Sequence, residues 1–493
     1  MMMIVAVCES SVVFGALCAL MLGWHRPPIH GWSDTAAALG VAGAFTLNAI
    51  SALYYADCYE LRVVPNLGRF VSRLPRSIAL ALVPLVGWHM LHPHSRMALI
   101  ASGLLMIGVL PVLRAAFYHI RRLQPFVKRV LIVGSNPQAY KVVEAIEQDG
   151  SGRYTIVGVA DDAGGVGEPL SRYPVVGPLH RLEKIIEATR PDRIVVALQD
   201  RRGRLPVPPL LEARLCGIVV EEGAELYERL TGKIAIESLT PSSLIFSPAF
   251  RPPALAMAVG RTLSLAVAVV GLVALAPLFA LIALLIRSDS AGPVFFVQER
   301  VGLGGRRFNL IKFRTMHVTG AAISEWACDN SDRITRVGYW LRRFRLDELP
   351  QFVNILRGDM DLVGPRPHPA TNFSLFVTVL RNSPECGQQI PYYSLRSLAR
   401  PGITGWAQVR YRYANNLEEE IEKVRYDLYY VKHRSLWLDL RILADTVKTV
   451  VSGRGAVDLE APPIEGRIGA APVWELAANP EQADVRLPGT KAA

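Results

Sequence analysis

The chain has 493 residues, enough for two to four domains of about 100 to 200 residues each. Hydrophobic residues make up 51% and charged residues only 20%, which is unusual for a soluble protein and implies that the apolar residues are concentrated in runs. The net charge of +11 suits nucleic acid, anionic lipid or phosphate-rich substrates equally well. Six scattered cysteines without a Cys-x-x-Cys pair indicate free thiols, not a disulfide framework or a zinc site.

Four apolar segments open the chain and predict four transmembrane helices within residues 1–120: 5–24, 32–55, 78–91 and 97–116. Glu9 interrupts the first segment, and no basic region or cleavage site accompanies it, so we expect no removable signal peptide. Four arginines lie between the second and third segments, and five basic residues lie at the end of the fourth or after it (Arg114, Arg121, Arg122, Lys128 and Arg129), whereas each of the other two loops holds one arginine. The positive-inside rule therefore predicts that both ends of this bundle face the cytoplasm.

Residues 125–250 alternate between strand and helix patterns and predict a cytoplasmic α/β domain of the Rossmann-like type. We expect strands over 129–134, 154–161 and 193–198, and helices over 139–148 and 182–188. The turn that starts at Gly134 resembles a dinucleotide fingerprint, but Asn136 stands where the second glycine would let a pyrophosphate approach. Cofactor binding and a structural or regulatory role both remain open for this domain.

A further apolar run covers residues 262–286, between Arg261 and Arg287. Its roughly 25 residues would reach about 37 Å as a straight helix, long enough to cross a hydrocarbon core. Pro277 lies inside the run, where it removes a helix hydrogen bond and clashes with the preceding turn. Two interpretations stay open: a simple kinked transmembrane helix, or a re-entrant helix that breaks at Pro277 and returns to the cytoplasmic face.

Residues 288 to about 450 are rich in Arg, Asp, Gly and Pro and predict a polar active-site domain, whereas 453–493 predicts a disordered tail. Within RRFRLDELPQ, residues 342–351, the adjacent carboxylates Asp347 and Glu348 follow three arginines. Such a pair can hold a divalent cation and supply an ionised nucleophile. The alternative is that both merely occupy the first turn of a helix, where the helix dipole favours acidic residues.

Two other groups combine turn formers with polar or aromatic side chains. Arg366 lies between two prolines in GDMDLVGPRP, residues 358–367, so its backbone is restrained and its guanidinium is suited to clamping a phosphate. The alternative is a rigid surface loop. In RPGITGWAQV, residues 400–409, Trp406 suits either a bound base or anchoring at a membrane interface. Lys312, Arg314, Arg342 and Arg345 are weaker phosphate-binding candidates, with solvated or lipid-facing basic residues as the alternative.

In order and spacing, these groups resemble the bacterial sugar transferases, the monotopic polyprenyl-phosphate hexose-1-phosphate transferases. The resemblance runs from about residue 261 to 450 and includes four more motifs: GPVFFVQERVG (292–302), KFRTM (312–316), RITRVG (333–338) and YDLYY (426–430). It implies an α+β catalytic domain over 255–452 with a re-entrant membrane helix over 262–286. The arrangement of the whole chain resembles the large subgroup, which has four spans and a Rossmann-like domain before this unit.

The resemblance also implies roles for single residues. Asp347 matches the nucleophile of the family, Glu348 its partner associated with Mg²⁺, and Arg366 the arginine near the nucleotide phosphates. Asp427 and Asp439 match two further acidic residues of the family's site. The chain departs from the family at the membrane helix, because Ala276 precedes Pro277 where serine is frequent, and Ser264 replaces an acidic residue.

The activity implied is transfer of a hexose 1-phosphate from a UDP-sugar to polyprenyl phosphate, with release of UMP, as the first membrane step of exopolysaccharide, O-antigen or capsule synthesis. We expect a multi-pass protein of the bacterial inner membrane, with Mg²⁺ as cofactor and the catalytic domain in the cytoplasm. Downstream glycosyltransferases and membrane lipid are expected partners, nucleic acid is not, and homo-oligomer formation stays open. Glucose or galactose is the expected sugar, although no residue selects it.

Two competing functions are weighed against this one. A nucleotide-sugar dehydratase or epimerase would use the Rossmann-like domain, but the missing second glycine and the lack of a Tyr-x-x-x-Lys element in residues 128–245 count against it. A scaffold for polysaccharide assembly would need no catalysis, and the intact pair Asp347 and Glu348 counts against that.

Overall fold

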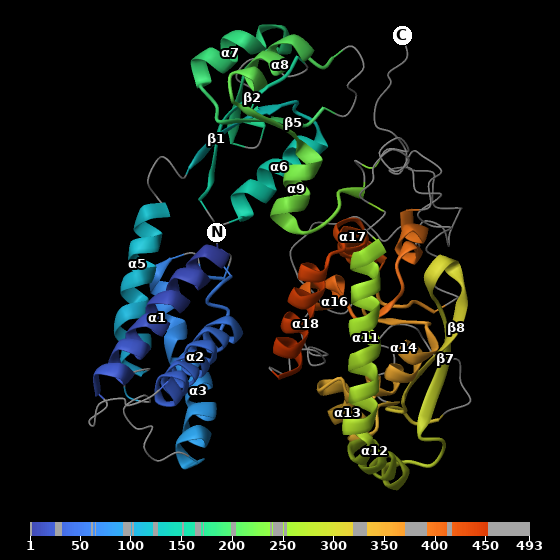
Figure 1. Cartoon of the computed structure of the whole chain (residues 1–493). Coiled ribbons are helices and arrows are strands. Elements are labelled where there is room, and N and C mark those ends of the chain that lie inside the picture. The colour runs from blue at the N-terminus through green and yellow to red at the C-terminus, as the bar shows by residue number, and fades with distance from the viewer. Residues whose placement is uncertain are drawn as a thin grey trace, which may run out of the picture.

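The computed structural model describes three groups of elements (Figure 1): N-terminal helices, an α/β domain and a C-terminal unit. The predicted tail, 453–493, lies outside the described residues. These residues are 2–24, 32–60, 63–64, 66–91, 100, 103–121, 127–149, 152–162, 169–170, 172–198, 204–236, 239, 250, 254–318, 333–369, 392–411 and 417–451.

The N-terminal part consists of helices that share one hydrophobic cluster, in which Leu17, Leu53, Phe70 and Leu110 are fully buried. The elements are α1 (Met2–Trp24), α2 (Trp32–Tyr55), α3 (Leu67–Leu91), the π-helical turn η2 (Leu105–Val109) and α5 (Leu110–Arg121). Helix α3 starts eleven residues before the predicted segment, because the Asn66 side chain accepts from the Arg69 amide and caps it. Arg69 therefore lies in a helix, not in the predicted loop.

Membrane crossing by this part stays a prediction. Within the described ranges, a single helix, α11 of the C-terminal unit, is long and apolar enough to span a membrane. The apolar stretches of the N-terminal helices are shorter and cover Val5–Ala19, Leu39–Tyr55 and Leu105–Ile120.

The buried charged residues described in this part of the chain are paired. Arg114 and Glu9 are fully buried, with 2.6 Å between Nε and Oε1, and the Tyr59 hydroxyl donates to the same carboxylate. An isolated charge in an apolar bundle would cost several kcal/mol, so pairing is what allows Glu9 to interrupt its apolar segment. The pair also ties α1 to α5.

The α/β domain contains a six-stranded sheet in the order β3-β4-β2-β1-β5-β6. Strands β1 (Lys128–Val133), β2 (Tyr154–Ala160), β4 (Tyr173–Gly177), β5 (Arg193–Val196) and β6 (Val219–Glu222) are parallel, and only β3 (Pro169–Leu170) runs antiparallel to its neighbour. Helices α6 (Pro137–Gln148) and α9 (Gly223–Thr231) pack in one hydrophobic cluster, and α7 (Leu182–Thr189) and α8 (Val207–Leu215) in another. The predicted Rossmann-like order of strands and helices is confirmed.

The turn after β1 is filled by the domain's own side chains. The carboxylate of Asp161 accepts from the Ser135 amide at 2.8 Å, and the Asn136 side chain caps α6 by accepting from Gln138 and Ala139. Gly134 has φ +109, and a Cβ there would lie 2.8 Å from the Ala197 carbonyl oxygen. These contacts favour a structural role for the turn, because the amides that would meet a pyrophosphate already have partners.

The C-terminal unit begins with α11 (Ala254–Ala274) and α12 (Ala276–Asp289), followed by the hairpin of β7 (Phe295–Val301) and β8 (Arg307–Phe313). Next come α13 (Arg336–Arg343), the 3-10 helix η9 (Leu346–Gln351), α14 (Phe352–Arg357) and β9 (Asp361–Val363). The 3-10 helix η11 (Tyr392–Leu398), β10 (Gly402–Thr404), α16 (Trp406–Arg410), α17 (Leu417–His433) and α18 (Leu436–Val451) complete the unit, with β9 and β10 parallel. Their core includes Ala268, Ile355, Met360, Tyr430 and Ile442.

The predicted helix break is confirmed at Pro277. Helix α11 ends at Ala274, Leu275 leaves the helical conformation, and α12 starts with Pro277 in its first turn. Because proline has no amide hydrogen, it fits the first turn of α12 and cannot continue α11. In Figure 1 the two helices point in different directions at the lower end of the unit.

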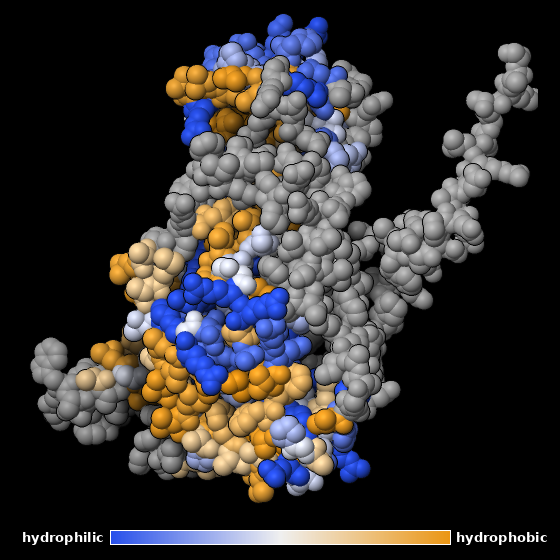
Figure 2. Space-filling view, turned by 90° about the vertical axis from the view of Figure 1, so that its right-hand side faces the viewer, coloured by the Kyte–Doolittle hydropathy of each residue, from blue (hydrophilic) through white to orange (hydrophobic). Residues whose placement is uncertain are grey.

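Both helices carry exposed apolar side chains, among them Val270, Val273 and Leu284, each more than 60% exposed. Figure 2 shows a hydrophilic patch at mid-height of one face, above a mostly apolar surface toward the end of the unit where α12 lies. An exposed apolar surface of this kind is typical of a membrane or partner contact.

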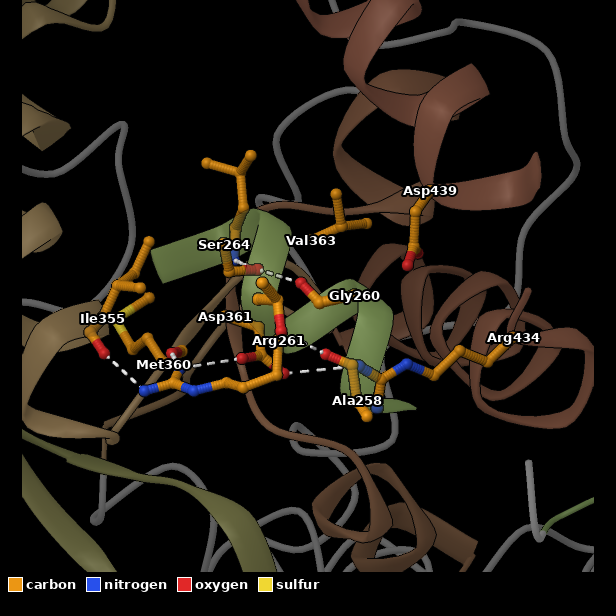
Figure 3. Close-up of polar contacts among 12 residues, drawn as sticks. Ala258, Gly260, Arg261, Ser264, Ile355, Met360, Asp361, Val363, Arg434 and Asp439 are labelled. Atoms are coloured by element: carbon orange, nitrogen blue, oxygen red, sulfur yellow. Dashed lines mark hydrogen bonds and ion pairs between the residues drawn. The ribbon is translucent and has the colours of Figure 1, made fainter. Parts of the chain in front are cut away.

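Polar contacts anchor α11 to the rest of the unit (Figure 3). Arg261 donates to the carbonyls of Ile355 and Met360, both at 2.7 Å, and its guanidinium lies 2.9 Å from the carboxylate of Asp361. The buried Ser264 hydroxyl accepts from the Leu362 amide. Ser264 thus joins α11 to β9.

Candidate active site

The two adjacent carboxylates lie on η9, the short helix that follows α13. Arg345 lies between α13 and η9 and has φ +52, a left-handed conformation that costs a non-glycine residue roughly 1 kcal/mol or more. The turn redirects the chain so that η9 packs against β8, which brings the carboxylates to Lys312. Asp347 and Glu348 do occupy the first turn of a helix, but basic side chains from three other elements surround them.

Glu348 is the buried member of the pair. Its Oε1 lies 3.0 Å from Nη1 of Arg366, and its Oε2 lies 4.0 Å from Nη1 of Arg345. Burial opposes ionisation, but the charges of the two guanidinium groups outweigh it and hold the pKa of Glu348 below its ordinary value. Glu348 is therefore a carboxylate throughout the physiological pH range.

Asp347 is partly exposed, and its side chain has no hydrogen bond or ion pair with the residues that the structure describes. Burial, and next the charge of Glu348, raise the pKa of Asp347 to about 6, although Lys312, Arg342 and Arg366 oppose this. Burial also lowers the pKa of Lys312 to about 8, against the charge of Asp347. A carboxylate without a fixed partner, beside cations, is suited to attack a phosphate.

Arg314, the second basic candidate on this hairpin, has a different environment from Lys312. It is 4% exposed, and its guanidinium donates to the main-chain carbonyls of Ser290 and Ala291, at 2.7 Å in the case of Ser290. It connects the end of β8 to the segment after α12. These contacts support a structural role for Arg314, and its role in substrate binding stays a prediction.

The two further acidic candidates, Asp427 and Asp439, are buried and lie in other networks. Asp427 on α17 pairs with Arg396, with 2.5 Å between the two side chains. Asp439 on α18 accepts from the Tyr430 hydroxyl at 2.8 Å and faces α11 near Gly260 (Figure 3). Burial is the main reason that the pKa of each rises to about 6. The contacts described for them do not include Asp347 or Glu348.

Comparison with known proteins identifies the unit that contains these residues. A family model described as bacterial sugar transferase matches residues 255–453. The exopolysaccharide production protein ExoY of Sinorhizobium fredii is 35% identical over 212 residues, which cover 40% of this chain and 87% of the relative. The chain belongs to the bacterial sugar transferase family.

Two further relatives of this sugar transferase carry enzyme names. The UDP-N-acetylgalactosamine-undecaprenyl-phosphate N-acetylgalactosaminephosphotransferase of Aeromonas hydrophila is 38% identical over 248 residues, 50% of this chain and 56% of the relative. The undecaprenyl-phosphate glucose phosphotransferase of Komagataeibacter xylinus is 31% identical over 336 residues, 67% of this chain and 60% of the relative. The chain thus spans somewhat more than half the length of each. Because 336 residues exceed the 199 of 255–453, the second similarity extends beyond the catalytic unit.

Two site residues of the sugar transferase were not predicted. Gln408 accepts from Nη1 of Arg345 at 3.1 Å, and Arg396 of η11 donates to the main-chain oxygen of Arg366 at 3.0 Å. Gln408 lies inside a motif noted for its turn formers, but Arg396 has no local signal, because its role depends on partners 30 and 31 residues away. Arg345 was a weaker candidate, and its position beside Glu348 strengthens it.

Trp406 serves as a contact between domains. The indole is 5% exposed, stacks on Tyr429 with 6.0 Å between ring centroids, and donates to the Gly232 carbonyl of the α/β domain at 2.9 Å. Neither predicted role, holding a base or anchoring at a membrane interface, agrees with this burial. Glu228 on α9 adds a second contact by accepting from Lys432 on α17 at 2.8 Å.

Proposed function

We propose that this sugar transferase moves a hexose 1-phosphate from a UDP-sugar to a polyprenyl phosphate, of the undecaprenyl class, and releases UMP. The observation that carries the proposal is Asp347, a carboxylate that lies beside Lys312 and the Glu348–Arg366 pair and has no ion pair with the described residues. The names of the relatives from Aeromonas hydrophila and Komagataeibacter xylinus support undecaprenyl phosphate as the acceptor. They also include two donors, a UDP-N-acetylgalactosamine and a glucose donor, so the sugar of this chain stays open.

The first step is attack of the Asp347 carboxylate on the phosphorus that carries the sugar. A bond forms between a carboxylate oxygen and that phosphorus, the bond to the bridging oxygen of the diphosphate breaks, and UMP leaves with the electron pair. The charges of Lys312 and Arg366 oppose the repulsion between a carboxylate and a diphosphate. At 4 Å such a repulsion between unit charges amounts to about 4 kcal/mol at an effective dielectric constant near 20.

In the second step an oxygen of the polyprenyl phosphate attacks the same phosphorus. The bond to Asp347 breaks, and the products are the polyprenyl-diphospho-sugar and the free carboxylate. Splitting the transfer in two lets each anionic substrate meet the cationic site separately. The Glu348–Arg366 contact then keeps the guanidinium beside the reacting group during both steps.

Mg²⁺ fits Asp347 better than it fits Glu348. Magnesium in phosphoryl-transfer sites is held by one or two carboxylates together with substrate phosphates and water. The oxygens of Glu348 face Arg366 and Arg345, whereas the carboxylate of Asp347 lacks a partner in the described part of the chain. That part contains no group of three acidic, His or Cys residues that could hold a metal. When bound, the ion would supply positive charge to the diphosphate.

For the membrane we propose that α11 and α12 form the re-entrant helix of a multi-pass protein of the inner membrane. The break at Pro277 and the exposed apolar side chains of Val270, Val273 and Leu284 support this arrangement. Arg261 and Arg287 then lie on the cytoplasmic side together with the active site. The four N-terminal segments would add four crossings, and glycosyltransferases that accept the lipid-linked sugar would act next.

The deciding experiment measures UMP release from a panel of UDP-sugars by the purified full chain, with and without undecaprenyl phosphate. We expect release from at least one hexose donor, turnover only with the acceptor, and neither in the Asp347→Asn variant. Absence of UMP release from every donor tested, in the presence of acceptor and Mg²⁺, would overturn the proposed activity.

A further inference from the structure

The loop that carries Arg366 is fixed in place mainly through hydrogen bonds to its main-chain carbonyls. The Arg366 side chain is 40% exposed, and its flanking prolines have no amide hydrogens to donate. In contrast, four consecutive carbonyls of the loop all accept hydrogen bonds, from the donors Gly402 N (to Pro365), Arg396 Nη2 (to Arg366), Arg300 Nη1 (to Pro367) and Val301 N (to His368).

Among these donors, Arg396 is itself paired with a buried carboxylate, that of Asp427. Its side chain is 7% exposed, that of Asp427 is 2% exposed, and the same nitrogen, Nη2, contacts the Asp427 carboxylate at 2.5 Å and the Arg366 carbonyl at 3.0 Å. A buried guanidinium without a carboxylate would be strongly unfavourable, so Asp427 is what allows Arg396 to lie behind the loop. The contact links α17 to the loop through η11.

Arg366 in turn contacts the catalytic pair, with 3.0 Å between its Nη1 and Oε1 of Glu348. A long, partly exposed side chain reaches one position reproducibly only if its own backbone is fixed. Misplacement of a charged group by about 1 Å can cost about 100-fold in rate. The position of the Arg366 backbone therefore matters to the chemistry.

We propose that Asp427 and Arg396 are positioning residues: through the Arg366 carbonyl they hold the Arg366 guanidinium against Glu348. This inference rests on the proposed function only for the part that Arg366 takes in the reaction. It assigns Asp427 a different role from that of a substrate ligand. The burial of Asp427 and its pairing with Arg396 support the assignment, and so does the distance along the network, since two side chains separate Asp427 from Glu348.

The kinetic test combines substitutions of these residues with loss of Arg366. We expect Arg396→Gln and Asp427→Asn each to lower kcat/KM for UMP release by 10- to 100-fold, mainly through kcat. Arg396→Lys, which keeps the charge, should restore part of the loss. An Arg366→Ala background lacks the guanidinium that Asp427 and Arg396 would position. Adding either substitution there should lower kcat/KM by less than about threefold. A full 10- to 100-fold loss in that background would overturn the proposal.

Hydrogen–deuterium exchange tests the same inference without activity. The Val301 amide donates to the His368 carbonyl, so its exchange reports opening of the loop. We expect faster exchange at Val301 in Arg396→Gln and Asp427→Asn. Unchanged exchange in both variants would contradict the proposal, even if the wild-type chain released no UMP and the proposed function itself failed.

The matched control is Arg434→Gln. Arg434 forms another ion pair, 3.3 Å from the buried Asp361, and none of the hydrogen bonds or ion pairs described for Arg434 reaches residues 365–368. This variant should lower the unfolding temperature, as the Arg396 variant does, with unchanged exchange at Val301 and kcat/KM within about threefold of wild type. If it changed both readouts as strongly as Arg396→Gln, the effect would be general destabilisation and the positioning role would be wrong.

Discussion

The guanidinium of Arg366 lies 3.0 Å from the carboxylate of Glu348, whereas the neighbouring Asp347 has no such partner among the described residues. Two adjacent acidic residues thus have opposite environments, and their pKa values move in opposite directions. Because the two pKa values are separated, one carboxylate of the site can stay charged while the other takes part in the reaction.

Replacement of Asp347 by Asn should abolish transfer without unfolding the protein. We expect UMP release to fall at least about 100-fold, because the amide is no nucleophile. The raised pKa of Asp347, about 6, means that its charge opposes folding at pH 7, so the unfolding temperature should stay equal or rise. Activity above a few per cent of wild type would exclude covalent catalysis through this residue.

Replacement of Glu348 by Gln should impair the reaction and change its magnesium dependence. The substitution leaves Arg366 without its carboxylate partner and removes a charge that raises the pKa of Asp347. A titration of UMP release against Mg²⁺ should therefore shift its midpoint. An unchanged midpoint would exclude an effect of Glu348 on magnesium binding.

The pH profile of UMP release should be bell-shaped. Asp347 attacks as the carboxylate, so the rate should rise as pH increases through about 6, its pKa. Lys312 stabilises phosphate as the ammonium ion, so the rate should fall above about 8. Lys312→Arg should remove the alkaline limb, and Glu348→Gln should move the acid limb to lower pH. A flat profile between pH 5 and 7 at limiting Mg²⁺ would contradict the assignment of Asp347.

Replacement of Arg314 by Gln should affect stability more than substrate affinity. The lost hydrogen bonds to the carbonyls of Ser290 and Ala291 should lower the free energy of unfolding by about 1 to 3 kcal/mol. KM for the UDP-sugar should stay within about threefold of wild type. A large rise in KM at unchanged unfolding temperature would instead support the predicted substrate-binding role.

Topology can be measured with single cysteines at Ser242 and Ser452, in a background without the native six. If the helix breaks at Pro277 and returns, both sites should resist an impermeant thiol reagent in intact spheroplasts and react after permeabilisation. Labelling of the second site alone from outside would mean a fifth crossing. Pro277→Leu should shift the chain toward that crossing and lower activity, because proline no longer ends the first helix.

Features set by local patterns could be predicted from the sequence. The strands and helices of the α/β domain follow from periodicity, and the break between α11 and α12 follows from the chemistry of Pro277. Asp347 and Glu348 are neighbours in sequence, so their proximity was certain, and three basic residues precede them in the same motif.

Features that depend on packing could not be predicted. Lys312 and Arg314 are two residues apart, which places side chains on one face of a strand, but β8 ends at Phe313 and Arg314 turns toward Ser290. Arg396 acquires its role from Asp427 and Arg366, which lie 31 and 30 residues away. No local pattern indicates such pairs.

The contact between Gly232 and Trp406 constrains how the two domains can diverge. Gly232 has φ +71, and a Cβ there would meet the indole at 3.1 Å. A larger residue at 232 would strain the turn and displace the ring, whereas a smaller residue at 406 would leave the Gly232 carbonyl without its donor. The two positions, 174 residues apart, should therefore covary in homologous chains that retain both domains, and a catalytic unit exchanged between such chains should function best when its own α/β domain accompanies it.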